Sequence, residues 1–90
     1  MNIVLFGATG GIGNCLSVDL SSNHSLFIGS RNKSQVDKLV SDIKSKNINS
    51  SNLINGCSVD ATSFESVSDF LNNSNEFLGS IDCIINCVGS

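Results

Sequence analysis

Residues 6–13 read Phe-Gly-Ala-Thr-Gly-Gly-Ile-Gly, and this glycine-rich stretch decides the fold of the chain. It follows an apolar, partly β-branched run at residues 2–6 and precedes a segment whose apolar residues recur with helical spacing. A tight turn between a strand and a helix favours glycine, and the first turn of a helix offers unpaired N–H groups to an anion. The stretch therefore predicts a buried strand, a phosphate-binding turn and a helix.

The glycines have separate roles in this interpretation. Gly7 makes the turn, and Gly13 lets the helix pack close to the strand. Gly10 or Gly11 lets the backbone approach a pyrophosphate. The alternative is a purely structural turn with no ligand. A Walker-type loop is excluded, because it needs Lys followed by Ser or Thr after the last glycine, and this chain has Asn-Cys there.

Three amphipathic helices are predicted from the spacing of apolar residues. Their expected buried faces are Ile12, Cys15, Leu16 and Leu20 in the first helix, Val36, Leu39, Val40 and Ile43 in the second, and Phe64, Val67, Phe70 and Leu71 in the third. Ser34 is the expected N-cap of the second helix, and Thr62 with Glu65 matches a capping box for the third. The polar residues 72–75 are expected to end the third helix.

Four strands are predicted at residues 2–6, 25–29, 53–59 and 81–88, with an interruption or bend near Gly56 in the third. Strands separated by helices pair in parallel through right-handed crossovers. We therefore expect an α/β fold, a Rossmann-like doubly wound parallel sheet with element order βαβαβαβ and strand order 3-2-1-4. Residues 1–90 are expected to form one dinucleotide-binding domain.

Composition excludes several classes of partner. Eight acids against five scattered bases give a net charge of −3, so we expect neither nucleic acid nor an anionic membrane as a partner. No apolar run approaches the roughly 20 residues needed to span a bilayer, and a cytoplasmic protein is expected. The four cysteines lack Cys-x-x-Cys spacing, so they are expected to be small buried residues and no metal site is expected. The single histidine, His24, is expected at the surface.

The end of the second strand bears on cofactor choice. In a dinucleotide-binding fold an acid there bonds the ribose 2′-hydroxyl, whereas a nearby base accommodates a 2′-phosphate. Here Ser30 stands before Arg31 and no acid precedes the arginine, so Arg31 is expected to pair with a 2′-phosphate and Ser30 to add a hydroxyl. The alternative is a solvated arginine before a helix.

These residues resemble the short-chain dehydrogenase/reductase family over the whole chain. The spacing of Gly7, Gly11 and Gly13, with Ile12 between the last two, is similar to the family's Gly-x-x-x-Gly-x-Gly. Gly10 also satisfies the Gly-x-x-Gly-x-x-Gly form of extended and atypical members. The Arg-Asn pair at residues 31–32 is similar to the turn of members that prefer NADP.

Two later segments extend the resemblance. Residues 59–62, Val-Asp-Ala-Thr, resemble the family's Asp-Val-Thr/Ser segment, which implies that Asp60 and Ala61 face the adenine. The alternative for Asp60 is an acid that precedes a helix. Residues 85–89, Ile-Asn-Cys-Val-Gly, resemble the Asn-Asn-Ala-Gly motif that lines the ribose, with Cys and Val in place of the second Asn and the Ala. The cofactor site implied in this way consists of Gly7, Thr9, Gly10, Gly11, Ile12, Gly13, Ser30, Arg31, Asp60, Ala61, Asn86, Val88 and Gly89.

The resemblance implies an NADP(H)-dependent oxidoreductase, with NAD the less favoured cofactor, that moves a hydride between nicotinamide and a carbonyl or alcohol. The family's catalytic Ser and Tyr-x-x-x-Lys follow the fourth strand, and this sequence contains no Tyr. We therefore assign no catalytic residue and expect an inactive chain, the N-terminal fragment of a longer domain whose full-length form meets its substrate and forms a homo-oligomer. The alternative is a complete, non-catalytic module that binds or senses a dinucleotide.

Overall fold

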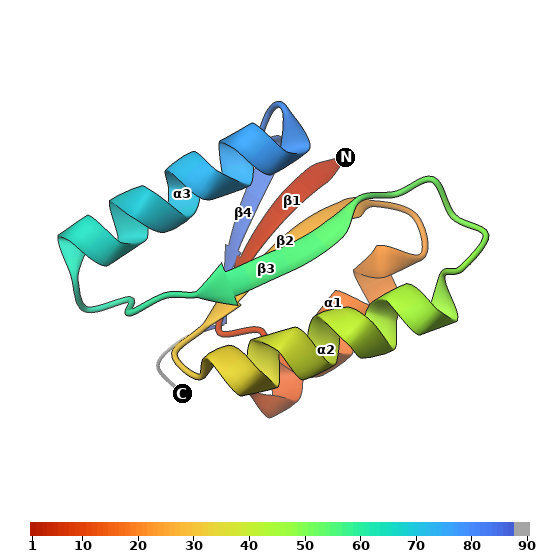
Figure 1. Ribbon diagram of the computed structural model, residues 1–90, viewed down its shortest axis with the longest axis horizontal. Coiled ribbons are helices and arrows are strands. Elements are labelled where there is room, and N and C mark those ends of the chain that lie inside the picture. The colour runs from red at the N-terminus through yellow and green to blue at the C-terminus, as the bar shows by residue number, and fades with distance from the viewer. Residues whose placement is uncertain (88–90) are drawn as a thin grey trace.

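The computed structural model describes residues 1–87 of the chain, and the elements alternate between strand and helix as predicted (Figure 1). In chain order they are β1 (Asn2–Phe6), α1 (Gly11–Ser21), β2 (Ser25–Ser30), α2 (Lys33–Lys46), β3 (Ile54–Ser58), α3 (Phe64–Leu78) and β4 (Cys83–Asn86). Strand β4 is shorter than expected at its start, because its register begins where Cys83 pairs with Ile3 of β1. Gly56 does not interrupt β3, where it pairs with Ile28.

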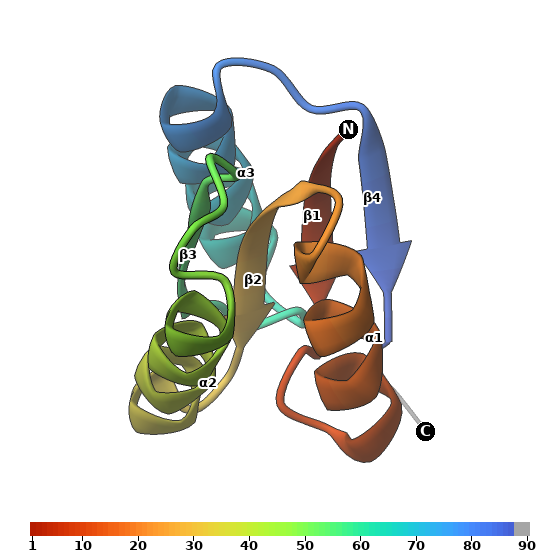
Figure 2. The same cartoon turned by 90° about the vertical axis from the view of Figure 1, so that its right-hand side faces the viewer.

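The four strands form one parallel sheet in the order β3-β2-β1-β4, which confirms the predicted topology. Helices α1 and α2 cover one face of the sheet and α3 covers the other, as the two perpendicular views show (Figures 1 and 2). Because β1 lies between β2 and β4, the turn that follows it is at the centre of the sheet edge. This is the place at which a doubly wound sheet binds its ligand.

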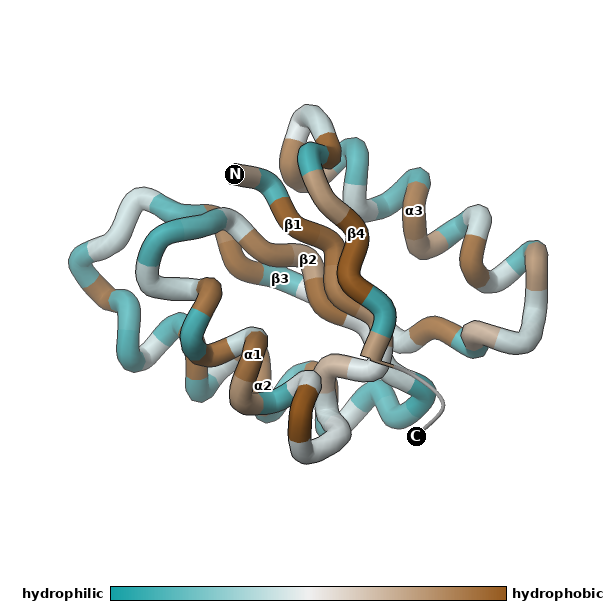
Figure 3. Tube along the Cα trace, turned by 180° about the vertical axis from the view of Figure 1, so that it is seen from behind, coloured by the Kyte–Doolittle hydropathy of each residue, from teal (hydrophilic) through white to brown (hydrophobic). Residues whose placement is uncertain are grey.

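Two hydrophobic clusters hold the helices against the sheet, and hydrophobic residues follow one another along β1 (Figure 3). Side chains alternate along β1, so that Ile3 and Leu5 pack toward α1 and α2 while Val4 and Phe6 pack toward α3. On the second side the ring of Phe70 contacts those of Phe6 and Phe27, with centroids 4.9 and 5.2 Å apart. A continuous apolar run in β1 therefore serves two cores at once.

Helix α2 buries all four residues of its predicted face. Its N-cap is Asn32, however, and the expectation of Ser34 was wrong. The Asn32 side chain accepts a hydrogen bond from the backbone N–H of Gln35 at 3.1 Å, and Ser34 already lies inside the helix, where its hydroxyl donates to the same Asn32 oxygen at 2.7 Å. Only two residues separate the end of β2 from the start of α2, so the helix begins two residues earlier than the apolar pattern indicates.

The predicted buried face of α1 was wrong at Ile12 and Cys15. Ile12 is 74% exposed and Cys15 is exposed, whereas Gly13, Ser17 and Ser21 are buried against the sheet. Small residues four positions apart let the helix lie close to the strands, and the Ser17 hydroxyl donates to the carbonyl of Gly13 at 2.7 Å. Leu16, Val18 and Leu20 are only partly buried at the sides of this contact. The remaining three cysteines are half-buried and unpaired, so cysteine is less buried than expected.

Helix α3 differs from its prediction at both ends. Its N-cap is Ser63, whose hydroxyl accepts a bond from the Ser66 N–H at 3.2 Å, and Thr62 does not form the expected capping box. The helix continues through residues 72–75 to Leu78, because Ser74 faces the sheet and donates its hydroxyl to the carbonyl of Phe70 at 2.7 Å. Phe64, predicted to be buried, is exposed, since it begins the helix beyond the edge of the sheet.

Candidate cofactor-binding site

The predicted site residues that the structure describes follow the carboxyl ends of the strands. The glycine turn follows β1, Ser30 ends β2 and is followed by Arg31, Asp60 comes two residues after β3, and Asn86 ends β4. Parallel pairing brings these ends to one edge of the sheet, although the residues lie as many as 79 positions apart in the sequence. Val88 and Gly89 lie outside the described residues. His24 lies at the opposite edge, with its Nδ1 3.1 Å from the N-terminal amino group.

Gly7 makes the turn with a φ of 75°, a left-handed conformation that favours glycine. The N–H groups of Gly7 and Ala8 both donate to the carbonyl of Gly29 in β2, at 2.8 and 3.1 Å. The turn is therefore attached to the neighbouring strand, and its prediction from the sequence is confirmed.

The close approach predicted at Gly13 is also present. A Cβ atom on Gly13 would lie 2.1 Å from the carbonyl oxygen of Gly7 and 2.9 Å from the Cα of Ala8, so any side chain there would push α1 away from the turn. The N-terminus of α1 thus lies directly over the end of β1. Only glycine permits this arrangement without a backbone shift.

Gly10 and Gly11 differ from Gly13 in their surroundings. A Cβ on Gly11 would meet nothing within 4 Å, and one on Gly10 would make only an ordinary contact of 3.6 Å. Gly10 is the N-cap of α1 and has no side chain to accept from the first N–H groups of the helix. Packing among residues 1–87 therefore does not require glycine at these two positions.

Two hydroxyl groups connect the glycine turn to the end of β2. The Oγ1 atom of Thr9 and the Oγ atom of Ser30 are 2.6 Å apart and share a hydrogen bond. Arg31 follows immediately, and its side chain is 78% exposed. A guanidinium and two hydroxyls beside a helix N-terminus are a set of donors that suits a phosphate.

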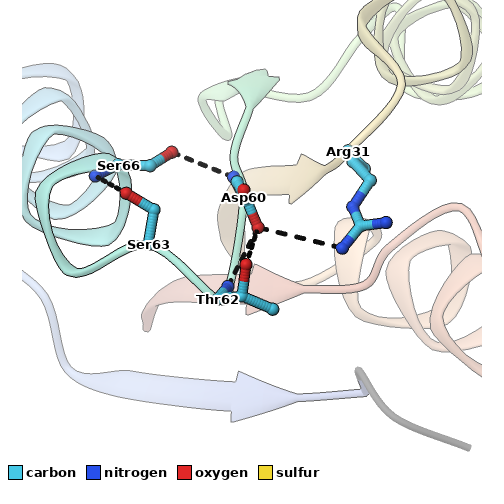
Figure 4. Close-up of polar contacts among 5 residues, drawn as sticks. All are labelled: Arg31, Asp60, Thr62, Ser63 and Ser66. Carbon is cyan, nitrogen blue, oxygen red and sulfur yellow. Dashed lines mark hydrogen bonds and ion pairs between the residues drawn. The ribbon is translucent and has the colours of Figure 1, made fainter.

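Asp60 lies within reach of Arg31, and its carboxylate is held in place by hydrogen bonds (Figure 4). The N–H and the hydroxyl of Thr62 donate to Oδ1 of Asp60 at 3.0 and 2.6 Å. The same oxygen is 3.8 Å from Nη2 of Arg31. The bonds from Thr62, helped by the charge of Arg31, lower the pKa of Asp60 below its usual value.

A pocket of about 200 Å³ opens beside this pair and is lined by Phe6, Ala61, Val67 and Asn86. The predicted site residues Ala61 and Asn86 therefore share one cavity. The backbone fixes its wall, because Asn86 pairs with Phe6 and the N–H of Cys87 donates to the carbonyl of Phe6 at 2.9 Å.

A second cavity of about 240 Å³ lies between α1 and α2 and was missed from the sequence. Its lining residues are Thr9, Asn14, Gln35, Lys38, Leu39 and Asp42. Polar residues on two helices give no sequence signal for such a cavity, because only the packing angle of the helices brings them together. Ile12, in contrast, was predicted in the site and points to solvent.

The whole chain, residues 1–90, matches the family model described as short chain dehydrogenase. It belongs to the short-chain dehydrogenase family. A curated relative is the 3-ketodihydrosphingosine reductase of Mus musculus, which is 25% identical over 91 residues. That match covers 99% of this chain and 27% of the mouse protein, so this short-chain dehydrogenase chain spans about a quarter of the relative's length.

Solved structures share the fold. Actinorhodin polyketide ketoreductase with NADPH superposes with a TM-score of 0.86 at 19% identity, over 99% of this chain and 33% of its own. An alcohol dehydrogenase from the archaeon Thermococcus sibiricus, complexed with 5-hydroxy-NADP, gives a TM-score of 0.83 at 23% identity, over 92% of this chain and 34% of its own. At these identities the likeness shows the fold of the family.

Among residues 1–87, none of the helices combines the length and the hydropathy that a membrane span requires. No group of three or more His, Cys, Asp or Glu side chains in the same range could hold a metal ion.

Proposed function

We propose that this chain is the cofactor-binding part of an NADP(H)-dependent short-chain dehydrogenase/reductase, and that residues 1–90 form the N-terminal part of a longer Rossmann domain. The complete enzyme would transfer a hydride between the nicotinamide and a carbonyl or alcohol substrate. Family membership and the shared fold support the nicotinamide dinucleotide as the ligand.

The observation that carries the proposal is the open space at Gly10 and Gly11. Both glycines lie at the N-terminus of α1, where unpaired N–H groups and the helix dipole favour a negative charge. No described residue would lie within 4 Å of a Cβ on Gly11, so packing among residues 1–87 does not account for glycine there, whereas a ligand would. A pyrophosphate that approaches the backbone at this point accounts for it.

A preference for NADP(H) rests on the end of β2. Arg31 is exposed and adjacent to the hydroxyl pair formed by Thr9 and Ser30, and β2 ends on Ser30 in place of the acid that would bond a ribose 2′-hydroxyl. The guanidinium and the two hydroxyls would hold the 2′-phosphate. The ketoreductase and the archaeal dehydrogenase, which share the fold, were solved with NADPH and 5-hydroxy-NADP.

The adenosine half of the cofactor would follow the sheet edge toward β4. Asp60 and Ala61 would face the adenine, and the pocket beside Ala61 and Asn86 offers a partly apolar recess for the ring. Asn86 would line the ribose, together with Val88 and Gly89. Bound in this way, the dinucleotide would cross the carboxyl ends of the strands, the usual direction in a doubly wound sheet.

The bound nicotinamide would supply the hydride, and this chain's residues would bind and orient the cofactor. None of them is assigned as a proton donor, because the family's catalytic residue is a Tyr and this sequence has none. The chain by itself is therefore expected to bind the cofactor without reducing a carbonyl.

Titration calorimetry with NADP⁺ and NAD⁺ tests the proposal. The wild type is expected to bind NADP⁺ at least about tenfold more tightly, since a charge-assisted bond to phosphate contributes roughly 1.5–3 kcal/mol. Arg31→Ala should remove most of this preference and leave NAD⁺ binding nearly unchanged. Equal affinities in the wild type would refute the NADP assignment, and the lack of any binding would refute the cofactor site itself.

A further inference from the structure

Asp60 and Arg31 come from different strand ends, and the structure places them within reach of each other. Oδ1 of Asp60 is 3.8 Å from Nη2 of Arg31, and this is the one ion pair of Arg31 within residues 1–87 (Figure 4). Both side chains are accessible from solvent at the edge where the cofactor is proposed to bind. The Arg31 guanidinium, which would attract a 2′-phosphate, is therefore already paired with the Asp60 carboxylate.

The two partners differ in how firmly they are held. The Asp60 carboxylate accepts both bonds from Thr62, and its backbone N–H donates to the Ser66 hydroxyl at 2.9 Å. Ser66 is in turn fixed in the first turn of α3, where its N–H donates to the hydroxyl of Ser63. The Arg31 side chain is 78% exposed and has no ion pair other than that with Asp60 within residues 1–87. Asp60 is thus a fixed negative charge, and Arg31 is the partner that adjusts.

A 2′-phosphate that binds Arg31 has to share the guanidinium with this carboxylate, and the two anions repel each other at short distance. NAD has a hydroxyl at the same position and suffers neither effect. The contact of Asp60 with the rest of the adenosine is common to both cofactors, so it cancels when their affinities are compared. The ratio of the two affinities therefore isolates the effect of Asp60 on the phosphate.

We propose that Asp60 is a specificity-determining residue that lowers the preference for NADP(H) over NAD(H) by competing with the 2′-phosphate for Arg31. This inference rests on the proposed function, because it assigns a second role to a residue of the same cofactor site. Exposed ion pairs of this kind are weak, so the effect is moderate.

The test compares dissociation constants of NADP⁺ and NAD⁺ for the wild type and Asp60→Asn at low ionic strength. Asn keeps the side-chain oxygen that the Thr62 bonds need, so the local structure is preserved. The NADP⁺ preference is expected to increase roughly twofold to fivefold, the range that exposed pairs give. Asp19→Asn is the matched control, because it removes the same charge from an exposed position near the other end of α1 and should leave the ratio unchanged.

A second measurement needs no cofactor. If the ion pair exists in solution, Arg31→Ala raises the pKa of the Asp60 carboxyl. This pKa can be measured by NMR of the carboxyl carbon of Asp60 in a pH titration. An unchanged pKa would overturn the inference. An unchanged or reduced NADP⁺ preference in Asp60→Asn would also overturn it, and a reduction would mean that Asp60 helps Arg31 to hold the phosphate. If Asp60→Asn gives one of these negative results while the wild type still prefers NADP⁺, the inference about Asp60 fails and the proposed function stands. If the wild type binds neither cofactor, the proposed function fails as well.

Discussion

At the scale of single residues, glycine is required for different physical reasons at different positions of the same turn. Gly7 is required by its positive φ, and Gly13 by the carbonyl oxygen that would lie 2.1 Å from a Cβ. Gly11 has neither cause within residues 1–87, since a Cβ there would meet no described atom within 4 Å. Substitutions at Gly11 and Gly13 should therefore separate the contribution of the turn to the stability of the fold from its contribution to the affinity for a ligand.

Gly11→Ala is expected to leave the fold intact and to weaken NADP⁺ binding. Alanine is favoured over glycine in a helix by up to about 1 kcal/mol, so the free energy of unfolding should stay the same or rise. The new methyl group would occupy the space proposed for the pyrophosphate and cost at least one charge-assisted bond, about a tenfold loss of affinity or more. Urea denaturation and calorimetry measure the two quantities.

Gly13→Ala is the matched comparison. It should destabilise the fold by about 1–3 kcal/mol or more, because its Cβ meets backbone atoms that cannot move aside easily. Full NADP⁺ affinity in Gly11→Ala would show that the open space at this position is not part of the cofactor site.

At the scale of elements, helix ends are decided by polar side chains that lie just outside the apolar pattern. Asn32 caps α2 and Ser63 caps α3, and in each case a neighbouring hydroxyl residue was expected to do so. In α3 the neighbour, Thr62, is used instead to hold the Asp60 carboxylate. The cap of α3 and the candidate site are therefore built from the same short segment.

Asn32→Ala is expected to lower the free energy of unfolding by about 1 kcal/mol, because the Gln35 N–H at the start of α2 loses its acceptor. Ser34→Ala is the matched control at the position that the sequence favoured, and its effect should stay within about 0.5 kcal/mol. Equal effects of the two substitutions in urea denaturation would contradict the assignment of Asn32 as the cap.

At the scale of the whole molecule, the sheet has an uneven exposure of its two edge strands. Both edge strands pair on one side only within the described residues, β3 with β2 and β4 with β1. Helices α2 and α3 pack against β3. On β4, in contrast, the apolar side chain of Ile84 is 52% exposed. An apolar strand with an unpaired edge is a template for pairing with another chain. Family relatives are several times longer than this chain, which agrees with the proposal of a longer domain.

The isolated 90-residue chain is expected to self-associate through β4, and Ile84→Lys should reduce the association, because a charge on an edge strand opposes pairing. Ile48→Lys is the matched control: Ile48 is 81% exposed, follows α2 and lies outside the sheet, so the same change of charge there should have little effect. Light scattering over a range of concentrations measures the association. A monodisperse wild type, or equal effects of both substitutions, would contradict a role of the β4 edge.

The order of elements, the parallel sheet and the glycine turn were determined by the sequence itself. These features depend on local chemistry: β1 is a continuous apolar run, α2 repeats its apolar residues at helical spacing, and Gly7 stands where the chain must turn. The glycines and Arg31 could be proposed as site residues from the same local pattern, whereas Asp60, Ala61 and Asn86 were proposed from the resemblance to the family's motifs.

Only the tertiary structure decided which side chains meet at that edge and how α1 lies on the sheet. Helix α1 buries serines in place of its apolar residues, because the contact at Gly13 fixes its distance and its rotation. The bond between Thr9 and Ser30 and the pair of Arg31 with Asp60 join separate strand ends. Their geometry depends on strand order and on the direction in which each chain segment leaves the sheet, and neither is encoded in the periodicity of a single element.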